Sequence, residues 1–245
     1  MRNVIEIRVK TLSNLFIGGS PMPFEIGGID LWTAVDEEGF PCIPASSLKG
    51  ALRSIVSGDD SREGKEIARW YQEELENERN ANWDRISSML NREGREQELE
   101  RIGKRYEGAV REASAAYLFG IREFNNTPKL LFHDLRLRKE YRDRKKCFSI
   151  DTKTAISQTG SELRSNPRTY KAARGGLVFE GEVELYRFTN PPFDEKAVKA
   201  CREYIIFNLK KFNNGAYRLG NSKSRGYGRI EVTVVEGEGQ EGEKL

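Results

Sequence analysis

The sequence predicts an α+β fold in which an antiparallel sheet carries a helical insertion and a thumb-like hairpin. Three observations lead to this prediction. Segments near both ends of the chain alternate apolar and polar side chains, as half-buried strands do. Between them lie a charged stretch of helical composition and a basic stretch without apolar periodicity. At 245 residues, the chain is long enough for one large domain or for a core with an elaborate insertion.

The N-terminal part begins with strands and then turns irregular. Residues 4–11 alternate with period two and predict a half-buried strand. Two glycine pairs within residues 18–28 indicate irregular backbone that something approaches closely, and Asp30 follows the second pair. Residues 31–43 predict a hairpin. From spacing alone, Asp30 either caps a turn or binds a metal ion.

Residues 44–56 predict a helix, with Ser46 or Ser47 as its cap. The free amides and the dipole at such a helix start favour a bound phosphate. Lys49 and Arg53 are four residues apart and share one face of the helix, so they can line the same groove. The alternative is an ordinary capped helix with a solvated basic face.

The middle of the chain divides into an acidic and a basic stretch. Residues 59–112 contain eleven Lys or Arg and fifteen Asp or Glu, and residues 59–116 predict a helical insertion. Residues 122–174 contain fourteen Lys or Arg and only six Asp or Glu. A basic surface of this kind favours a polyanionic partner. Within it, residues 141–176 lack apolar periodicity, which is typical of a thumb-like hairpin or functional loop, and also of disorder.

The C-terminal part returns to regular elements. Residues 129–137 and 177–188 predict strands, and residues 194–209 predict a helix. We expect a core of residues 1–58 and 117–235 around the insertion. The order of these elements resembles an elaborated ferredoxin-like antiparallel sheet, the plan that RNA-recognition domains also use. The acidic, glycine-rich tail 236–245 predicts disorder.

The glycine-rich stretch 219–230 is the strongest candidate binding loop. Its glycines permit positive φ, while Lys223, Ser224 and Arg225 add cations and a hydroxyl group, so that phosphate is the expected ligand. Tyr227 offers a stacking face. The spacing is not that of a Walker loop. The alternative is a basic turn before the last strand.

Composition excludes several classes of function. Neither a leader peptide nor an apolar run of membrane-spanning length is found, and the three cysteines are far apart, so we expect a cytoplasmic protein that does not contact membranes. His133 is the single histidine, which argues against a two-histidine ribonuclease and a Ser-His-Asp hydrolase. Carboxylates remain as the candidate catalytic groups.

The terminal loop, with its Gly-x-Ser-Lys-Ser-Arg-Gly-Tyr-Gly-Arg pattern, resembles the glycine-rich signature of the RAMP superfamily of CRISPR-associated proteins. Other segments occur in the order seen in the repeated backbone subunits of type III effector complexes. These segments are Ile17-Gly18-Gly19, residues 25–30, residues 43–53 and Leu118-Phe119-Gly120.

This resemblance implies that several copies stack along a guide RNA as a helical filament, together with other effector-complex subunits. Each copy would cut the paired target RNA as a metal-dependent endoribonuclease, with Asp30 as the catalytic residue and the ligand of Mg²⁺ or Mn²⁺. Residues 156–174 correspond to the family's thumb. Phe16 stands where related members often carry a histidine, whose role is then absent or replaced by stacking. The expected RNA-binding residues are Ser46, Ser47, Lys49, Arg53, Arg164, Arg168, Lys223, Ser224 and Arg225.

Three alternatives stay open at this stage. The chain can be an RNA-binding subunit without chemistry, in which case replacing Asp30 leaves cleavage unchanged. It can be a guide-processing ribonuclease, although such enzymes usually need a histidine in the N-terminal half. A small-molecule enzyme on a ferredoxin-like sheet would show no salt-dependent affinity for RNA.

Overall fold

The computed structural model describes residues 3–19, 29–125, 127–159, 162–188 and 192–235, and their side chains except those of 155–166. The chain forms two compact units. The sheet unit holds residues 4–52, 132–183 and 206–245, and the helical unit holds residues 1–3, 53–131 and 184–205. The second glycine pair and the tail for which disorder was predicted lie outside the described residues.

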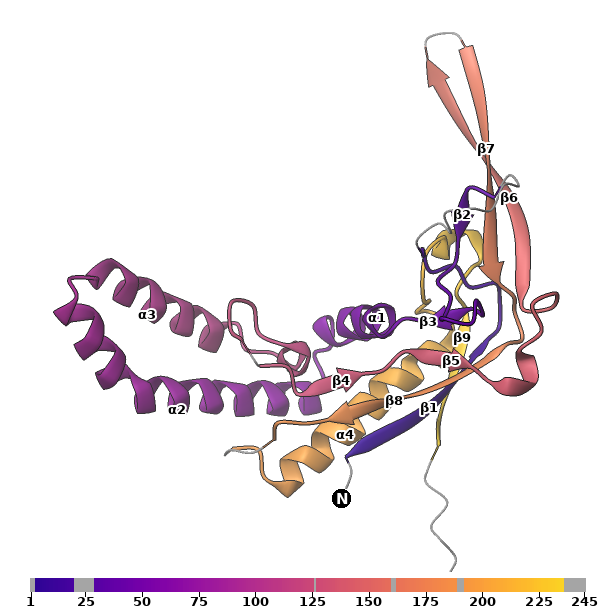
Figure 1. Ribbon diagram of the computed structural model, residues 1–245. Coiled ribbons are helices and arrows are strands. Elements are labelled where there is room, and N and C mark those ends of the chain that lie inside the picture. Colours follow the sequence, from indigo (N-terminus) through magenta and orange to yellow (C-terminus); the bar gives the residue numbers. More distant parts are fainter. Residues whose placement is uncertain (1–2, 20–28, 126, 160–161, 189–191, 236–245) are drawn as a thin grey trace, which may run out of the picture. The chain divides into compact units, whose positions relative to one another are not determined.

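The main sheet has the strand order β3-β5-β8-β1-β9, and β4 pairs with β8 (Figure 1). The pairs β1–β9, β3–β5 and β5–β8 are antiparallel, so the prediction of an α+β fold with an antiparallel sheet is confirmed. Its strands are β1 (Val4–Thr11), β3 (Cys42–Ile43), β4 (Leu130–Phe132), β5 (Leu135–Leu137), β8 (Val178–Leu185) and β9 (Ile230–Val235).

Strand β1 has the predicted alternation, since Ile5, Ile7 and Val9 are buried. Its last residue, Thr11, is fully buried and polar. The Thr11 hydroxyl donates to the carbonyl of Arg174 at 2.9 Å and accepts from the amide of Leu177 at 3.0 Å. A hydroxyl satisfied in both roles costs little to bury, and here it fixes the end of β1 to the segment that leaves the second sheet.

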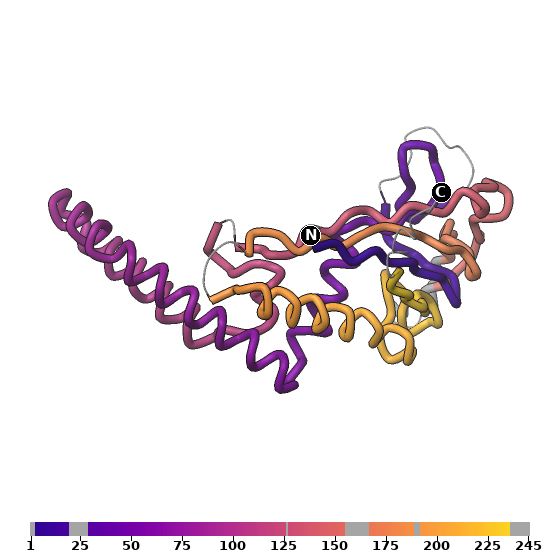
Figure 2. Tube along the Cα trace, turned by 90° about the horizontal axis from the view of Figure 1, so that it is seen from below, coloured from indigo at the N-terminus to yellow at the C-terminus, as the bar shows by residue number. Residues whose placement is uncertain are grey.

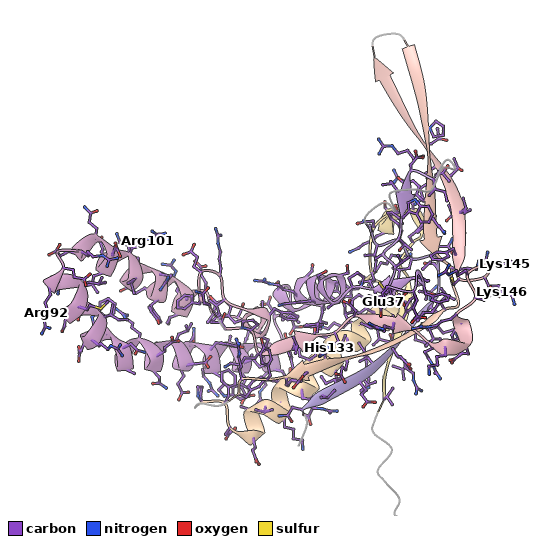
Figure 3. The ribbon with its side chains drawn as sticks, viewed as in Figure 1. Glu37, Arg92, Arg101, His133, Lys145 and Lys146 are labelled. Atoms are coloured by element: carbon purple, nitrogen blue, oxygen red, sulfur yellow. The ribbon has the colours of Figure 1, made fainter. Side chains whose placement is uncertain are left out.

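The second sheet has the order β2-β7-β6, with β2 (Leu31–Trp32), β6 (Phe148–Thr159) and β7 (Glu162–Ala173). Strands β6 and β7 form a long antiparallel hairpin, and β2 pairs with β7 in parallel (Figure 1). A hairpin therefore occupies the segment expected to hold one, and its first strand begins at Phe148, earlier than the predicted 156. Lys145 and Lys146, labelled in Figure 3, are exposed on the turn that leads into β6.

The helices are α1 (Ala45–Ser57), α2 (Arg62–Arg92), α3 (Glu96–Arg111) and α4 (Glu195–Lys210). Ser61 caps α2 by accepting from the amide of Gly64 at 3.1 Å. Figure 2 shows α2 and α3 side by side as a helical hairpin, and Figure 3 labels Arg92 at the end of α2 and Arg101 on α3. The insertion predicted at 59–116 thus contains these two helices. No described helix is both long and apolar enough to cross a membrane.

The base of the helical unit is organised by a buried lysine. Lys129 donates to Glu74 at 2.7 Å, and its ammonium lies 4.6 Å from the centroid of the Phe193 ring and 5.5 Å from that of Phe188. Burying a charge is costly unless it is paired, and this ion pair and these ring faces supply the compensation.

Two details of the sequence prediction were wrong, and they are related. The strand expected over 129–137 is two short strands, interrupted at His133 and Asp134. Helix α1 begins at Ala45, so Ser46 and Ser47 lie inside its first turn and are not its cap. The amide of Ala45 donates instead to the carboxylate of Asp134 at 2.7 Å. A carboxylate distant in sequence therefore supplies the interaction that was assigned to a neighbouring serine.

Candidate nucleic-acid interface

The loop formed by residues 219–228 has a backbone that depends on left-handed residues. Gly220, Gly226 and Gly228 have φ of 77°, 89° and 74°, and Ser222 has φ of 58°. Only glycine adopts these angles without steric cost. The predicted need for glycine at positive φ is therefore confirmed for this loop.

Two of these glycines are also fixed by close backbone contacts. A Cβ at Gly220 would overlap the carbonyl of Phe16, and a Cβ at Gly228 would overlap that of Leu219. The same carbonyl of Phe16 accepts from the amide of Asn221 at 2.7 Å, and Leu219 donates to the carbonyl of Gly228 at 2.9 Å. The loop is thus packed directly on the backbone of the segment after β1.

Asn14 connects three segments at this point. Its carbonyl accepts from the amide of Gly228 in the loop at 2.9 Å. Its side chain donates to Asp151 on β6 at 3.0 Å and accepts from the amide of Gly175, just beyond β7, at 3.1 Å. Asn14 therefore ties the glycine-rich loop, through its backbone carbonyl, to both strands at the base of the hairpin, through its side chain.

Asp151 is the polar centre of the hairpin base. Its carboxylate accepts from Asn14, from the hydroxyl of Ser149 at 3.0 Å and from the hydroxyl of Tyr227 in the loop. Burial alone would raise the pKa of Asp151, but the hydrogen bonds from Tyr227, Asn14 and Ser149 outweigh burial and lower it. The ionised carboxylate thus holds the loop against β6.

Lys153, two residues further along β6, makes the second contact with the loop. Its ammonium donates to the hydroxyl of Ser222 at 3.0 Å. It also lies 3.6 Å from the centroid of the Tyr227 ring and 4.4 Å from that of Tyr170. Burial, and next the charge of Arg225, lower the pKa of Lys153.

The structure brings part of the predicted RNA-binding set together. Lys223, Ser224 and Arg225 are exposed on the turn at the tip of the loop. Arg168 on β7 pairs with Lys153 on β6, so both side chains leave the hairpin on the face that meets the loop. These residues form one basic surface, which we call the loop–hairpin surface.

The other predicted residues are placed separately. Ser46, Ser47 and Lys49 lie in the first turns of α1 within the sheet unit. Arg53 belongs to the helical unit. The side chain of Arg164 lies outside the described residues.

Asp30 is hydrogen-bonded to β7 along the edge that pairs with β2, opposite the edge that pairs with β6. Its amide donates to the carbonyl of Thr169 at 2.9 Å, and its carboxylate accepts from the amide of Thr169 at 2.6 Å. Thr169 follows Arg168 on β7, so the exposed carboxylate lies next to the strand that carries a residue of the loop–hairpin surface.

The described residues contain no cluster of three or more His, Cys, Asp or Glu side chains that could hold a metal ion. Asp30 offers one carboxylate, of which one oxygen is already an acceptor. This donor set does not make a protein cage. It fits the mode in which Mg²⁺ is held by one carboxylate, while water and substrate phosphate complete its coordination.

Two aromatic residues differ from expectation. Tyr227 is only 8% exposed, and Phe16 is 4% exposed and packs edge-on against Tyr170, with ring centroids 5.2 Å apart. Neither ring is exposed enough to stack on a base, so the stacking face expected of Tyr227 was wrong. For Phe16, the alternative in which stacking replaces the role of the family histidine is excluded. Both rings instead belong to the small core under the loop.

Sequence reasoning missed Asn14, Asp151 and Lys153, which hold this surface together. Asn14 follows Ser13 in a short polar step after a strand, and the two β6 residues lie in a segment without apolar periodicity. The one available signal was the pair of oppositely charged residues at positions 151 and 153, which are two apart and would share one face of a strand.

Comparisons with known proteins give a family and a fold. The sequence model of the RAMP superfamily matches residues 8–231. A chain of a type III-B Cmr-beta complex bound to cognate target RNA is similar with a TM-score of 0.52 and 17% identity, over 95% of this chain and 60% of that one. A chain of apo type III-B Cmr-beta has a TM-score of 0.46 and 15% identity, over 95% and 97%. No curated protein matches in sequence.

Proposed function

The chain belongs to the RAMP superfamily, and we propose that it is a guide-RNA-binding backbone subunit of a type III CRISPR effector complex, which cleaves the paired target RNA. The observation that carries the proposal is the loop–hairpin surface. There the family's glycine-rich loop and the base of a long hairpin present Lys223, Arg225 and Arg168 on one side of the sheet unit.

Such a surface binds the RNA backbone. Lysine and arginine side chains neutralise phosphates and release counterions, so affinity falls as salt rises and depends little on base sequence. Sequence is then recognised by base pairing between guide and target. We assign to the long β6–β7 hairpin the role of the thumb, which kinks the guide RNA. The order β5-β8-β1-β9 agrees with the ferredoxin-like plan of RNA-recognition domains.

Assembly is the second part of the proposal. The type III-B Cmr-beta chain with a TM-score of 0.52 belongs to a complex bound to target RNA. This chain spans 60% of the length of that chain. We assign to this chain a place beside other copies and other subunits. A head-to-tail contact that does not close on itself produces a helical filament along the guide.

Cleavage is assigned to Asp30. A divalent cation at a carboxylate neutralises charge at a phosphate and activates the attacking oxygen. The proposed reaction is attack of a 2′-hydroxyl of the target, which loses its proton to water, on the adjacent phosphate. The bond from phosphorus to the 5′-oxygen breaks, and the products are a 2′,3′-cyclic phosphate and a 5′-hydroxyl that has taken up a proton. The contribution of this chain is to hold the metal through Asp30 and to bend the target toward in-line geometry, with Arg168 close along β7.

The second candidate function is RNA binding without cleavage. It is favoured by the hydrogen bond between Asp30 and the amide of Thr169, which gives the carboxylate a structural role. The two candidate functions differ in the role of Asp30, so one substitution at this residue can distinguish them.

The experiment is target-RNA cleavage by the assembled effector complex. Asp30→Asn keeps an oxygen that accepts from Thr169 but removes the charge, and Asp60→Asn, at an exposed aspartate, is the matched control. We expect cleavage to fall at least 100-fold in Asp30→Asn and in chelator, with RNA binding retained, and to be unchanged in Asp60→Asn. Full cleavage by Asp30→Asn would overturn Asp30 as the catalytic metal ligand, and it is the result that the binding subunit without chemistry predicts.

A further inference from the structure

Lys153 differs from an ordinary surface lysine in its neighbours. It lies between two aromatic rings, with its ammonium 3.6 Å and 4.4 Å from the ring centroids of Tyr227 and Tyr170. An ammonium has three donors, and the hydrogen bond to Ser222 uses one of them. The group is therefore held in position with donors to spare.

The charges around Lys153 are unbalanced. Arg225 lies at the tip of the loop, and its amide donates at 2.9 Å to the carbonyl of Ser222, the residue whose hydroxyl accepts from Lys153. The charge of Arg225 accordingly lowers the pKa of Lys153, after burial as the first cause. Asp151 is the carboxylate that opposes this effect, and it already accepts from Tyr227, Asn14 and Ser149. Two cations held together in this way gain from an anion that binds both.

We infer that Lys153 and Arg225 together bind one phosphate of the RNA backbone at the junction of loop and hairpin; this inference rests on the proposed RNA-binding function. Ser222 orients the ammonium, and the contact of Asp151 with Tyr227 keeps the loop at the correct distance from β6. Lys153 is thus an RNA ligand from the base of the hairpin, distinct from the exposed cations of the loop.

The hairpin contains a matched control on its other face. Lys171 on β7 also lies between two aromatic rings, 4.0 Å from the ring centroid of Trp32 and 4.6 Å from that of Phe148. Strand alternation places it on the face opposite Tyr170, away from the loop. A general need for a lysine in an aromatic cage would affect both residues equally.

The experiment measures the affinity of the full chain for a labelled single-stranded RNA over a range of salt concentrations. One lost phosphate contact reduces the slope of log affinity against log salt by about 0.7. We expect this reduction, with a loss of affinity of about three- to tenfold near physiological salt, for Lys153→Met and Arg225→Met. Lys153→Arg should keep the wild-type slope, and so should Lys171→Met.

A purely structural role for Lys153 gives a different result. Ser222→Gly removes the hydroxyl and tolerates the left-handed backbone, so it should weaken binding without changing the slope. If Lys153→Met behaves as Ser222→Gly does, or as Lys171→Met does, the inference is overturned while RNA binding stands. If the wild-type chain shows no salt-dependent affinity for RNA, the proposed function itself fails. Circular dichroism of each variant confirms that it is folded.

Discussion

The loop–hairpin region and the α2–α3 hairpin show two ways of holding a chain in shape. In the loop, left-handed residues and backbone contacts specify the conformation, and Asn14, Asp151 and Lys153 fix it to β6. In the helical hairpin, two helices of regular backbone are held together by contacts of their side chains. Trp83 packs on Gly103, Arg79 lies 3.4 Å from Glu107, and the pair Lys104–Glu100 is on the surface.

The two regions differ in how well they tolerate a substitution. Surface ion pairs contribute about 0–1 kcal/mol each, so losing any one of them costs the helical hairpin about 1 kcal/mol at most. In the loop, one added methyl group at Gly220 or Gly228 overlaps a backbone carbonyl, that of Phe16 or of Leu219. Precision of this kind is needed where a ligand must be positioned, as it must be at the RNA-binding surface that we propose on the sheet unit.

The largest effect is expected for Gly228→Ala. The new Cβ would overlap the carbonyl of Leu219, and φ of 74° is strained for any L-residue. We expect a loss of at least about 3 kcal/mol in the free energy of unfolding, near the upper range for single substitutions. Urea unfolding, with hydrogen exchange to resolve the two units, measures it.

Gly226→Ala separates the two causes. Gly226 has φ of 89°, but a Cβ there meets nothing within 4 Å. Only the backbone strain remains, so the loss should be about 1–2 kcal/mol. Equal losses in the two variants would show that the contact with Leu219 contributes nothing.

The next effect is that of Tyr227→Phe. The substitution keeps the ring beneath the loop and removes the hydroxyl that donates to Asp151. Hydrogen bonds to charged groups contribute about 1.5–3 kcal/mol, and Asn14 and Ser149 remain as partners. We expect a loss of about 1–2 kcal/mol near neutral pH, measured by urea unfolding.

The pH dependence tests the same contact. The pKa of Asp151 is lowered from its ordinary 3.8, so its stabilisation is present above that value and is lost as the pH falls through the folded-state pKa. The pKa of Tyr227 is raised by burial and by the bond to Asp151, so its contribution is full below the ordinary value of 10.0 and is lost as the pH rises beyond it. Tyr227→Phe should reduce both losses, and unchanged profiles would contradict the contact.

These two regions also explain what sequence could predict. Strand β1 was predicted from its periodicity, because it buries one face, and the helical insertion was predicted from its charged, helical composition. The β6–β7 hairpin gave no such signal, since its described side chains do not form a fully buried face, and Ile150 on β6 is 64% exposed. Sequence therefore indicated only a long segment for which hairpin and disorder were both possible.

The candidate site shows the same limit. The glycines, Lys223 and Arg225 were found because the loop is contiguous in sequence. Asn14 and Asp151 were missed because their role comes from contacts between segments that are 137 residues apart. The ring of Tyr227 was wrongly expected to be exposed. The sequence of a basic loop does not show whether a tyrosine ring faces solvent or packs, as here, with Phe16 and Ala172.

The smallest effect is expected in the helical hairpin and has the opposite sign. Gly108 lies inside α3, and a Cβ there meets nothing within 4 Å. Glycine inside a helix costs about 0.5–1 kcal/mol relative to alanine, so Gly108→Ala should stabilise the helical unit by about that amount. Hydrogen exchange of α3 measures the gain.

Gly103→Ala in the same helix is its control. Its Cβ would lie 3.2 Å from the Trp83 ring, so the ring must shift and the gain in helix propensity is offset. A loss of stability in Gly108→Ala would mean that α3 is held by tertiary contacts as closely as the loop is, and the contrast between the two regions would fail. A gain that leaves RNA affinity unchanged would show that the rigidity needed for binding is confined to the loop–hairpin surface.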